Sequence, residues 1–327
     1  MENKAKKNNG FSLFDFLYKY GTLLTIVLLL IFFSIASPRF LTQSNIINIL
    51  RSISIVTIIA IGITISLSVG GFDLSVGSVA SISVAIVISM FVWHEQNAFV
   101  SILVALLASL VAGAINAFMI VKVKVQDMLM TLATMFIFQG VALTYTKGAV
   151  ISQNMVMANG ETAPGKISPL FAQLGKVPWI IIIMLVVVLV VHIFLTYTKH
   201  GRYMYIIGGN MEAARLSGIP VTKYRVIAYL LSALFAAIGG IILGSRVMTA
   251  EINAGAPYLM DAVAAAYIGF SVGGSGKANA IGTLVGAVLI GILQNGLVML
   301  SVPYYAMDIV KGTVLAFALA LTYYKKR

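Results

Sequence analysis

The sequence predicts an all-α polytopic membrane protein with about ten transmembrane helices. The 327-residue chain is 60% hydrophobic and only 10% charged, with a mean hydropathy of +1.00, whereas a soluble domain carries about 25% charged residues. Apolar runs of about 20 residues, the length of a bilayer-crossing helix, recur along the chain. These runs are continuous rather than alternating, which disfavours a membrane β-barrel. No polar block is long enough to fold alone, so residues 1–327 are predicted to form a single transmembrane domain.

The apolar runs place the spans, and polar stretches separate them. The first span follows the basic segment MENKAKKNNG and starts only near residue 21, which favours a retained helix over a cleaved signal peptide. Residues 147–178 are polar and contain Pro164, Gly165 and Pro169, so they are predicted to be a loop. The predicted spans are 21–36, 52–69, 74–92, 98–121, 128–146, 179–197, 226–245, 258–271, 281–302 and 304–324.

The basic residues set the predicted orientation. A net charge of +12 is compatible with nucleic-acid binding, but in a membrane protein Lys and Arg more often mark the cytoplasmic side. With the N-terminus inside, fifteen of the 22 Lys and Arg residues are cytoplasmic and one, Lys311, lies within a span. The chain is therefore predicted to be N-in and C-in, with segments 1–20 and 198–225 in the cytoplasm. Six basic residues remain outside: Arg39, Arg51, Lys147, Lys166, Lys176 and Arg246.

Ten spans divide into two halves of five, and an odd number per half inverts the second half relative to the first. Inverted repeats of this kind are common in transporters, with the solute site near interrupted helices. Each half contains an interruption in which an aspartate is predicted to open a helix of small residues, Asp73 in GGFDLSVGS and Asp261 in NAGAPYLMDAV. The two carboxylates either cap these helices or also shape gates.

Other intramembrane polar residues have two interpretations each. Asn116 and Gln294 either hydrogen-bond a hydroxylated solute or bridge helices. The candidate translocation path therefore comprises Asp73, Asn116, Asp261 and Gln294.

Further features of the spans favour structure over chemistry. Asp308 and Lys311, three residues apart, are predicted to pair on one helix face, as a structural ion pair or as part of a pathway. The glycine ladder that begins with Gly282 and Gly286 predicts close helix packing. The chain has no Cys and three scattered His, so neither a disulfide nor a metal site is predicted.

The cytoplasmic segment 198–225 contains a predicted two-turn helix at 211–217. Asn210 is a suitable N-cap, Glu212 lies in the first turn where the helix dipole favours an acid, and Gly218 with Pro220 stops the helix. So short a helix is marginal alone, which favours a docking element for a cytoplasmic partner over a plain connecting loop.

Several ordered motifs resemble the monosaccharide ABC-importer permeases of the ribose, xylose and galactose group. They are GGFDLSVGSVASIS (70–83), GAINAFMIVKVKVQ (113–126), GRYMYIIGGNMEAARLSGIPVTKYR (201–225), MDAVAAAYIGF (260–270) and IGTLVGAVLIGILQNGL (281–297). Phe72, where relatives usually carry Ile, and SVGGSGKANA (271–280) depart from the family pattern.

The resemblance implies ten helices, a pair of permease chains, a cytoplasmic ABC ATPase and an extracytoplasmic substrate-binding protein. It also implies that the 201–219 segment contacts the ATPase. The residues that carry over to this role are Gly201, Asn210, Glu212, Ala213, Ala214, Arg215 and Gly218.

ATP hydrolysis is predicted to occur on a partner chain. The stretch around Gly276 and Lys277 imitates a phosphate-binding loop, but Ser271 replaces its first glycine and Ala278 its hydroxyl residue. No cofactor is therefore expected on this chain, with ATP and Mg²⁺ on the ATPase.

The function predicted from these observations is ATP-driven import of a monosaccharide or similar small polar solute across a bacterial inner membrane. Autoinducer-2, a nucleoside or a branched-chain amino acid are alternative solutes. An ion-coupled secondary transporter is disfavoured because a relay of intramembrane carboxylates is lacking. An intramembrane enzyme is disfavoured because the sequence shows no Ser–His pair on adjacent spans, no HExxH motif and no paired catalytic Asp motif. Whether the permease pairs with itself or with a sister chain stays open.

Overall fold

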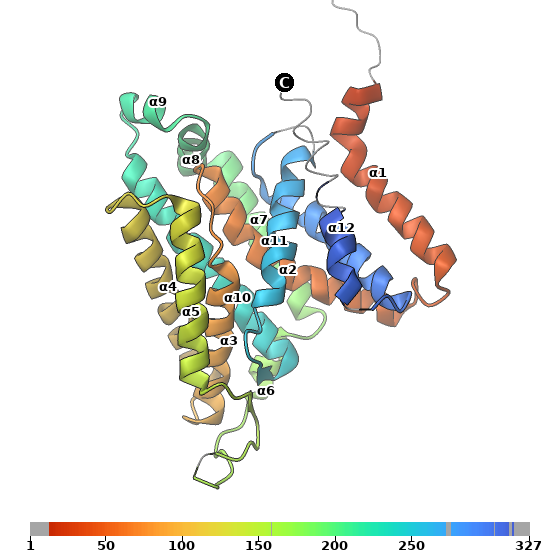
Figure 1. Ribbon diagram of the computed structural model, residues 1–327, viewed down its shortest axis with the longest axis vertical. Coiled ribbons are helices and arrows are strands. Elements are labelled where there is room, and N and C mark those ends of the chain that lie inside the picture. The colour runs from red at the N-terminus through yellow and green to blue at the C-terminus, as the bar shows by residue number, and fades with distance from the viewer. Residues whose placement is uncertain (1–12, 158, 273–275, 304, 314–315, 317–327) are drawn as a thin grey trace, which may run out of the picture.

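The computed structural model describes residues 13–157, 159–272, 276–303, 305–313 and 316, and these residues are mostly helical (Figure 1). The described elements also include two short strands, β1 (Ile151–Ser152) and β2 (Thr249–Ala250). The helices are α1 (Leu13–Ala36), α2 (Gln43–Ser68), α3 (Val76–Val92), α4 (Ala98–Val121), α5 (Asp127–Thr146), α6 (Pro169–Leu174), α7 (Trp179–Tyr197), α8 (Lys199–Gly209), α9 (Met211–Leu216), α10 (Val221–Val247), α11 (Ala256–Ser271) and α12 (Ala280–Met299).

The described helices confirm an all-α polytopic membrane protein. Six of them, α2, α4, α5, α7, α10 and α12, are long and apolar enough to cross a membrane, and three shorter apolar helices lie in α1, α3 and α11. Together they cover the first nine predicted spans. Residues 305–313 of the tenth are helical, whereas 304 and most of 314–324 lie outside the described residues.

The centre of the bundle is built from α2 and α10, which pack against each other. Every residue of α2 from Ile53 to Ser66 is buried, so this stretch of the helix is covered on all sides. A helix that is apolar all round belongs in the core. The helices α4, α5 and α7 instead carry exposed apolar side chains, such as Phe99 and Phe136, as expected of a surface that faces lipid.

Hydrogen bonds and glycine contacts fix α12 against two neighbours. Asn45 of α2 and Asn295 of α12 exchange amide hydrogen bonds of 2.9 Å each, and Thr64 bonds Thr283 at 2.7 Å further along the same two helices. At Gly286, an added Cβ would lie 2.3 Å from a carbonyl oxygen of α11, so only glycine allows this approach. The predicted packing role of the glycine ladder is confirmed.

The two polar segments of the chain lie at opposite ends of the molecule (Figure 1). The helices α8 and α9 occupy one end, together with the beginning of α1. The loop that contains β1 and α6 occupies the other, where β1 pairs antiparallel with β2 and joins this loop to the segment after α10. Segments 198–225 and 147–178 are thus on opposite sides, as predicted, whereas the N-in orientation itself and the inverted repeat stay predictions.

The segment 198–225 holds two helices where the sequence predicted one. The helix α9 ends at Leu216, slightly before the predicted end at residue 217, and Gly218 adopts a left-handed φ of +77°. The helix α8 was not predicted, because Gly208 and Gly209 resemble a break. Gly208 instead permits close packing, since a Cβ there would lie 2.5 Å from the Ser68 carbonyl oxygen at the end of α2.

The helix α8 is also anchored to the second half of the chain. The Tyr205 hydroxyl donates to the Ala278 carbonyl oxygen at 2.8 Å. Burial raises the pKa of Tyr205 to about 12, so this phenol stays protonated and remains a donor at neutral pH.

Candidate functional site: a polar cavity and the helix α9 at the opposite end

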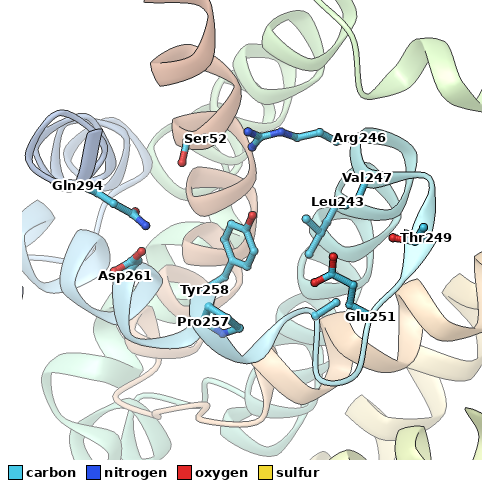
Figure 2. Close-up of a pocket in the computed structure, with 11 residues that line it drawn as sticks. Ser52, Leu243, Arg246, Val247, Thr249, Glu251, Pro257, Tyr258, Asp261 and Gln294 are labelled. Atoms are coloured by element: carbon cyan, nitrogen blue, oxygen red, sulfur yellow. The ribbon is translucent and has the colours of Figure 1, made fainter. Parts of the chain in front are cut away.

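A cavity of about 390 Å³ opens near the end of the molecule that carries β2 and α6 (Figure 2). Its walls come from α2, α10, α11, α12 and the segment between α10 and α11. Two of the predicted path residues, Asp261 and Gln294, lie on one side of it. No group of three His, Cys, Asp or Glu suited to a metal ion occurs among the residues the structure describes. The polar lining residues are Ser52, Arg246, Thr249, Glu251, Tyr258, Asp261 and Gln294.

The structure corrects two predictions about Asp261, its partner and its place in the helix. The carboxylate is paired with Lys311. Lys311 Nζ lies 3.0 Å and 3.3 Å from the two carboxylate oxygens, so the predicted pairing of Lys311 with Asp308 is wrong. A buried carboxylate is costly unless a counter-ion or hydrogen-bond donors satisfy it, and Asp261 is 6% exposed whereas Asp308 is exposed to its surroundings. Asp261 also does not open its helix, because α11 already begins at Ala256 and places the aspartate in its second turn.

The other two predicted path residues, Asp73 and Asn116, lie together in a buried network. Asp73 accepts hydrogen bonds from the Ser75 backbone at 2.9 Å and hydroxyl at 2.6 Å, and from the Ser232 hydroxyl at 2.7 Å. Asn116 donates to the Ser75 hydroxyl at 2.8 Å and accepts from Thr134 at 2.7 Å. The network joins residues 69–75, the non-helical segment between α2 and α3 that we call the α2–α3 break, to α4, α5 and α10. Asn116 therefore bridges helices, and neither residue lines the cavity.

Replacing Asn116 by leucine is expected to destabilise the fold by about 1–3 kcal/mol, because buried hydroxyl groups lose their partners. Gln294→Leu is the matched control, since its amide faces the cavity and makes no hydrogen bond that holds helices together. The measurement is thermal unfolding of both purified variants in detergent. An equal loss of stability in the two variants would contradict the conclusion that Asn116 holds helices together whereas Gln294 does not.

At the opposite end, α9 has the caps that the sequence predicted. The Asn210 side chain accepts from the Ala213 backbone at 2.9 Å. Glu212 and Arg215 form an exposed ion pair at 2.8 Å, which contributes little stability in water. Ala214 is fully buried against Met204 and other apolar residues of α8 and α10. Its small side chain seats α9 on the bundle rather than facing outward.

Leu216 is a surface residue that the sequence interpretation missed. It is 88% exposed at the end of α9, and it lies three residues after the exposed Ala213, so the two share one helix face. The exposed face that Leu216 shares with Ala213 is therefore accessible to another chain. The sequence interpretation assigned Ala214 to the partner contact, whereas the packing turns Ala214 inward and leaves Leu216 on the outer side.

An ion pair connects the end of the molecule that carries α8 and α9 to the α2–α3 break. Arg225, in the second turn of α10, bonds both oxygens of Asp127 at 2.5 Å and 2.6 Å, and Tyr229 donates to the same carboxylate. Asp127 is the first residue of α5. A Cβ at Gly71, in the break, would lie 2.8 Å from the Asp127 carboxylate. No local pattern indicates this contact, because Asp127 and Arg225 are 98 residues apart in the chain.

Comparisons with known proteins match more than nine-tenths of the chain. The family model described as branched-chain amino acid transport system / permease component matches residues 45–319. The ribose import permease protein of Escherichia coli (strain K12) is 36% identical over 305 residues, 92% of each chain. That of Bacillus subtilis (strain 168) is 37% identical over 93% of this chain and 92% of the relative.

A third relative, the L-arabinose transport system permease protein of Escherichia coli (strain K12), is 30% identical over 94% of this chain and 92% of its own. No solved structure matches the chain significantly. The resemblance to monosaccharide permeases seen in the motifs is confirmed by these relatives. This multi-pass membrane protein therefore belongs to the family of branched-chain amino acid transport system permease components, in which it is similar to import permeases for ribose and arabinose.

Proposed function

We propose that this chain is the transmembrane subunit of an ATP-driven importer that carries a monosaccharide, ribose first among the candidates, across a bacterial inner membrane. The supporting observation is its similarity to ribose import permeases over more than nine-tenths of both chains. The family description names branched-chain amino acids, so an amino acid is the second candidate solute.

The chain is a transport subunit rather than an enzyme, and its energy comes from partners. A separate cytoplasmic ATPase binds ATP and Mg²⁺ and docks on α9, through the exposed face with Ala213 and Leu216. A second permease chain completes the membrane part. An extracytoplasmic binding protein delivers the solute to the end that carries the cavity, which lies away from α8 and α9.

ATPase motion is transmitted through the contacts that α8, α9 and the start of α10 make with the rest of the bundle. Closure of the ATPase moves α9 as a rigid element, and α9 leads through Pro220 into α10. The Arg225–Asp127 ion pair passes this motion to α5 and to the α2–α3 break, while Gly208 of α8 presses on the same break. Rigid-body motion outside the membrane thus tilts helices inside it, as alternating access requires.

Ion-coupled transport receives less support. Such transporters use intramembrane carboxylates or histidines that bind and release protons. Asp73 is held by two serines, and Asp261 by Lys311. Both carboxylates are thereby committed to structural partners in the described part of the chain.

The proposal is tested by reconstitution into liposomes with the cognate ATPase and binding protein. Uptake of radiolabelled D-ribose is expected only with internal ATP and an intact ATPase. Arabinose, xylose and leucine are measured in parallel to identify the solute. Uptake driven by a proton gradient without ATP would contradict the proposal, and ATP-driven uptake of leucine alone would transfer it to amino acids.

A further inference from the structure

Two charged side chains face the cavity without an ion pair. Arg246, at the end of α10, and Glu251, after β2, are both exposed and line the cavity. Neither takes part in a salt bridge anywhere in the described ranges, and no side-chain hydrogen bond holds either of them. Figure 2 shows Arg246 above Tyr258 and Glu251 below it, with their polar groups directed toward the cavity. Their hydrogen-bonding capacity is therefore available to a solute.

The opposite wall supplies an amide and a carboxylate. Gln294 points from α12 toward Tyr258, and Asp261 lies beside it (Figure 2). An amide donates and accepts at neighbouring atoms, and a carboxylate accepts at two oxygens. Because Lys311 already neutralises Asp261, this wall presents hydrogen-bonding groups with little net charge.

We propose that this cavity is a direct binding site for a neutral polyhydroxylated solute, held between Arg246 and Glu251 on one side and Gln294 on the other. Neighbouring hydroxyls of a sugar each donate and accept, which suits a guanidinium, carboxylates and an amide arranged around one space. The Tyr258 ring provides an apolar face for the carbon side of the sugar. The volume of about 390 Å³ lies within the range of small-molecule sites.

The proposal rests on the proposed function for the choice of solute, but it adds a site on the permease itself. The balance of charge around the cavity is the physical reason for a neutral solute. Arg246 offsets Glu251, and Lys311 offsets Asp261, so a net anion or cation gains no attraction. An amino acid such as leucine would need a largely apolar pocket for its side chain, whereas seven of the eleven residues that line this cavity carry polar groups.

The test is D-ribose binding to the full-length permease in lipid nanodiscs, without ATPase or binding protein, by saturation-transfer NMR. Saturable binding is expected in the wild type. Gln294→Met, which keeps the side-chain length, is expected to weaken it about tenfold, the cost of lost polar contacts. Gln173→Met is the control, because Gln173 is an exposed glutamine of α6 at the same end that does not line the cavity. Glu251→Gln and Tyr258→Ala are measured alongside.

The outcomes separate this proposal from the proposed function. ATP-driven ribose uptake by the reconstituted importer, without saturable ribose binding by the permease, would overturn the cavity site and leave the function standing. Unchanged binding in Gln294→Met, Glu251→Gln and Tyr258→Ala would also overturn it. Leucine displacing ribose at lower concentration than ribose itself would overturn the choice of a polyhydroxylated solute. Loss of binding in the three cavity variants, with Gln173→Met like the wild type, supports it.

Discussion

Leu216→Glu is expected to abolish binding of the ATPase and, with it, ATP-driven uptake. The side chain is 88% exposed at the end of α9, so the fold itself should tolerate glutamate. In an assembled importer, this leucine would be buried in the contact with the ATPase. A buried, unpaired carboxylate there is strongly unfavourable, and loss of one central contact commonly costs about 2 kcal/mol or more of binding free energy. Co-purification of tagged permease with its ATPase measures the effect.

Leu170→Glu is the matched control for this substitution. Leu170 is a leucine of similar exposure, 77%, on the short helix α6 at the opposite end of the molecule. The same charge placed there should leave ATPase binding unchanged. If Leu170→Glu also releases the ATPase, the effect is a general one on folding or insertion. If Leu216→Glu retains the ATPase, α9 is not its docking helix.

Arg225→Met is expected to destabilise the protein by about 2–4 kcal/mol and to uncouple ATP hydrolysis from uptake. The ion pair with Asp127 is mostly buried, with side chains 15% and 19% exposed. Removing one partner leaves a buried charge without its counter-ion, which costs more than the pair contributed. Thermal unfolding and the ratio of ATP hydrolysed to solute transported measure the two effects.

The double variant Asp127→Asn with Arg225→Met separates stability from coupling. It leaves neither charge unpaired, so most of the lost stability should return. Coupling should stay low, because the contact between α10 and α5 is still missing. Uptake of the double variant at the wild-type rate would show that the ion pair is only structural.

The sequence predicted the fold more completely than the site. The spans follow from hydrophobic length, and the caps of α9 follow from local chemistry at Asn210 and Gly218, both of which lie within a few residues of what they control. The contacts of Asp261 and Asp127 are different. Each carboxylate is satisfied by a residue on another helix, Lys311 or Arg225, and the choice among such partners depends on helix packing. Periodicity and motif spacing contain no information about that packing.

The same dependence on helix packing explains why the four predicted path residues lie in two separate places. Asp73 and Asp261 look alike in sequence, since each lies near an interrupted helix. In the structure, Asp73 is surrounded by serines, whereas Asp261 faces a cavity and a lysine. Whether any of the four contacts the solute during transport stays a prediction, and only Asp261 and Gln294 are placed beside a space for it.

The paired amides and hydroxyls between α2 and α12 restrict how the cavity can change shape. Asn45–Asn295 and Thr64–Thr283 lie toward opposite ends of the two helices. A piston-like slide of one turn, about 5.4 Å, would break both pairs at once and drive the Gly286 contact with α11 into a clash. A hinge that swings α12, α11 and α2 together leaves all of these bonds intact. The wall that carries Gln294, Asp261 and Tyr258 then moves as one body, so the cavity changes shape where this body meets the segment from Arg246 to Ala254.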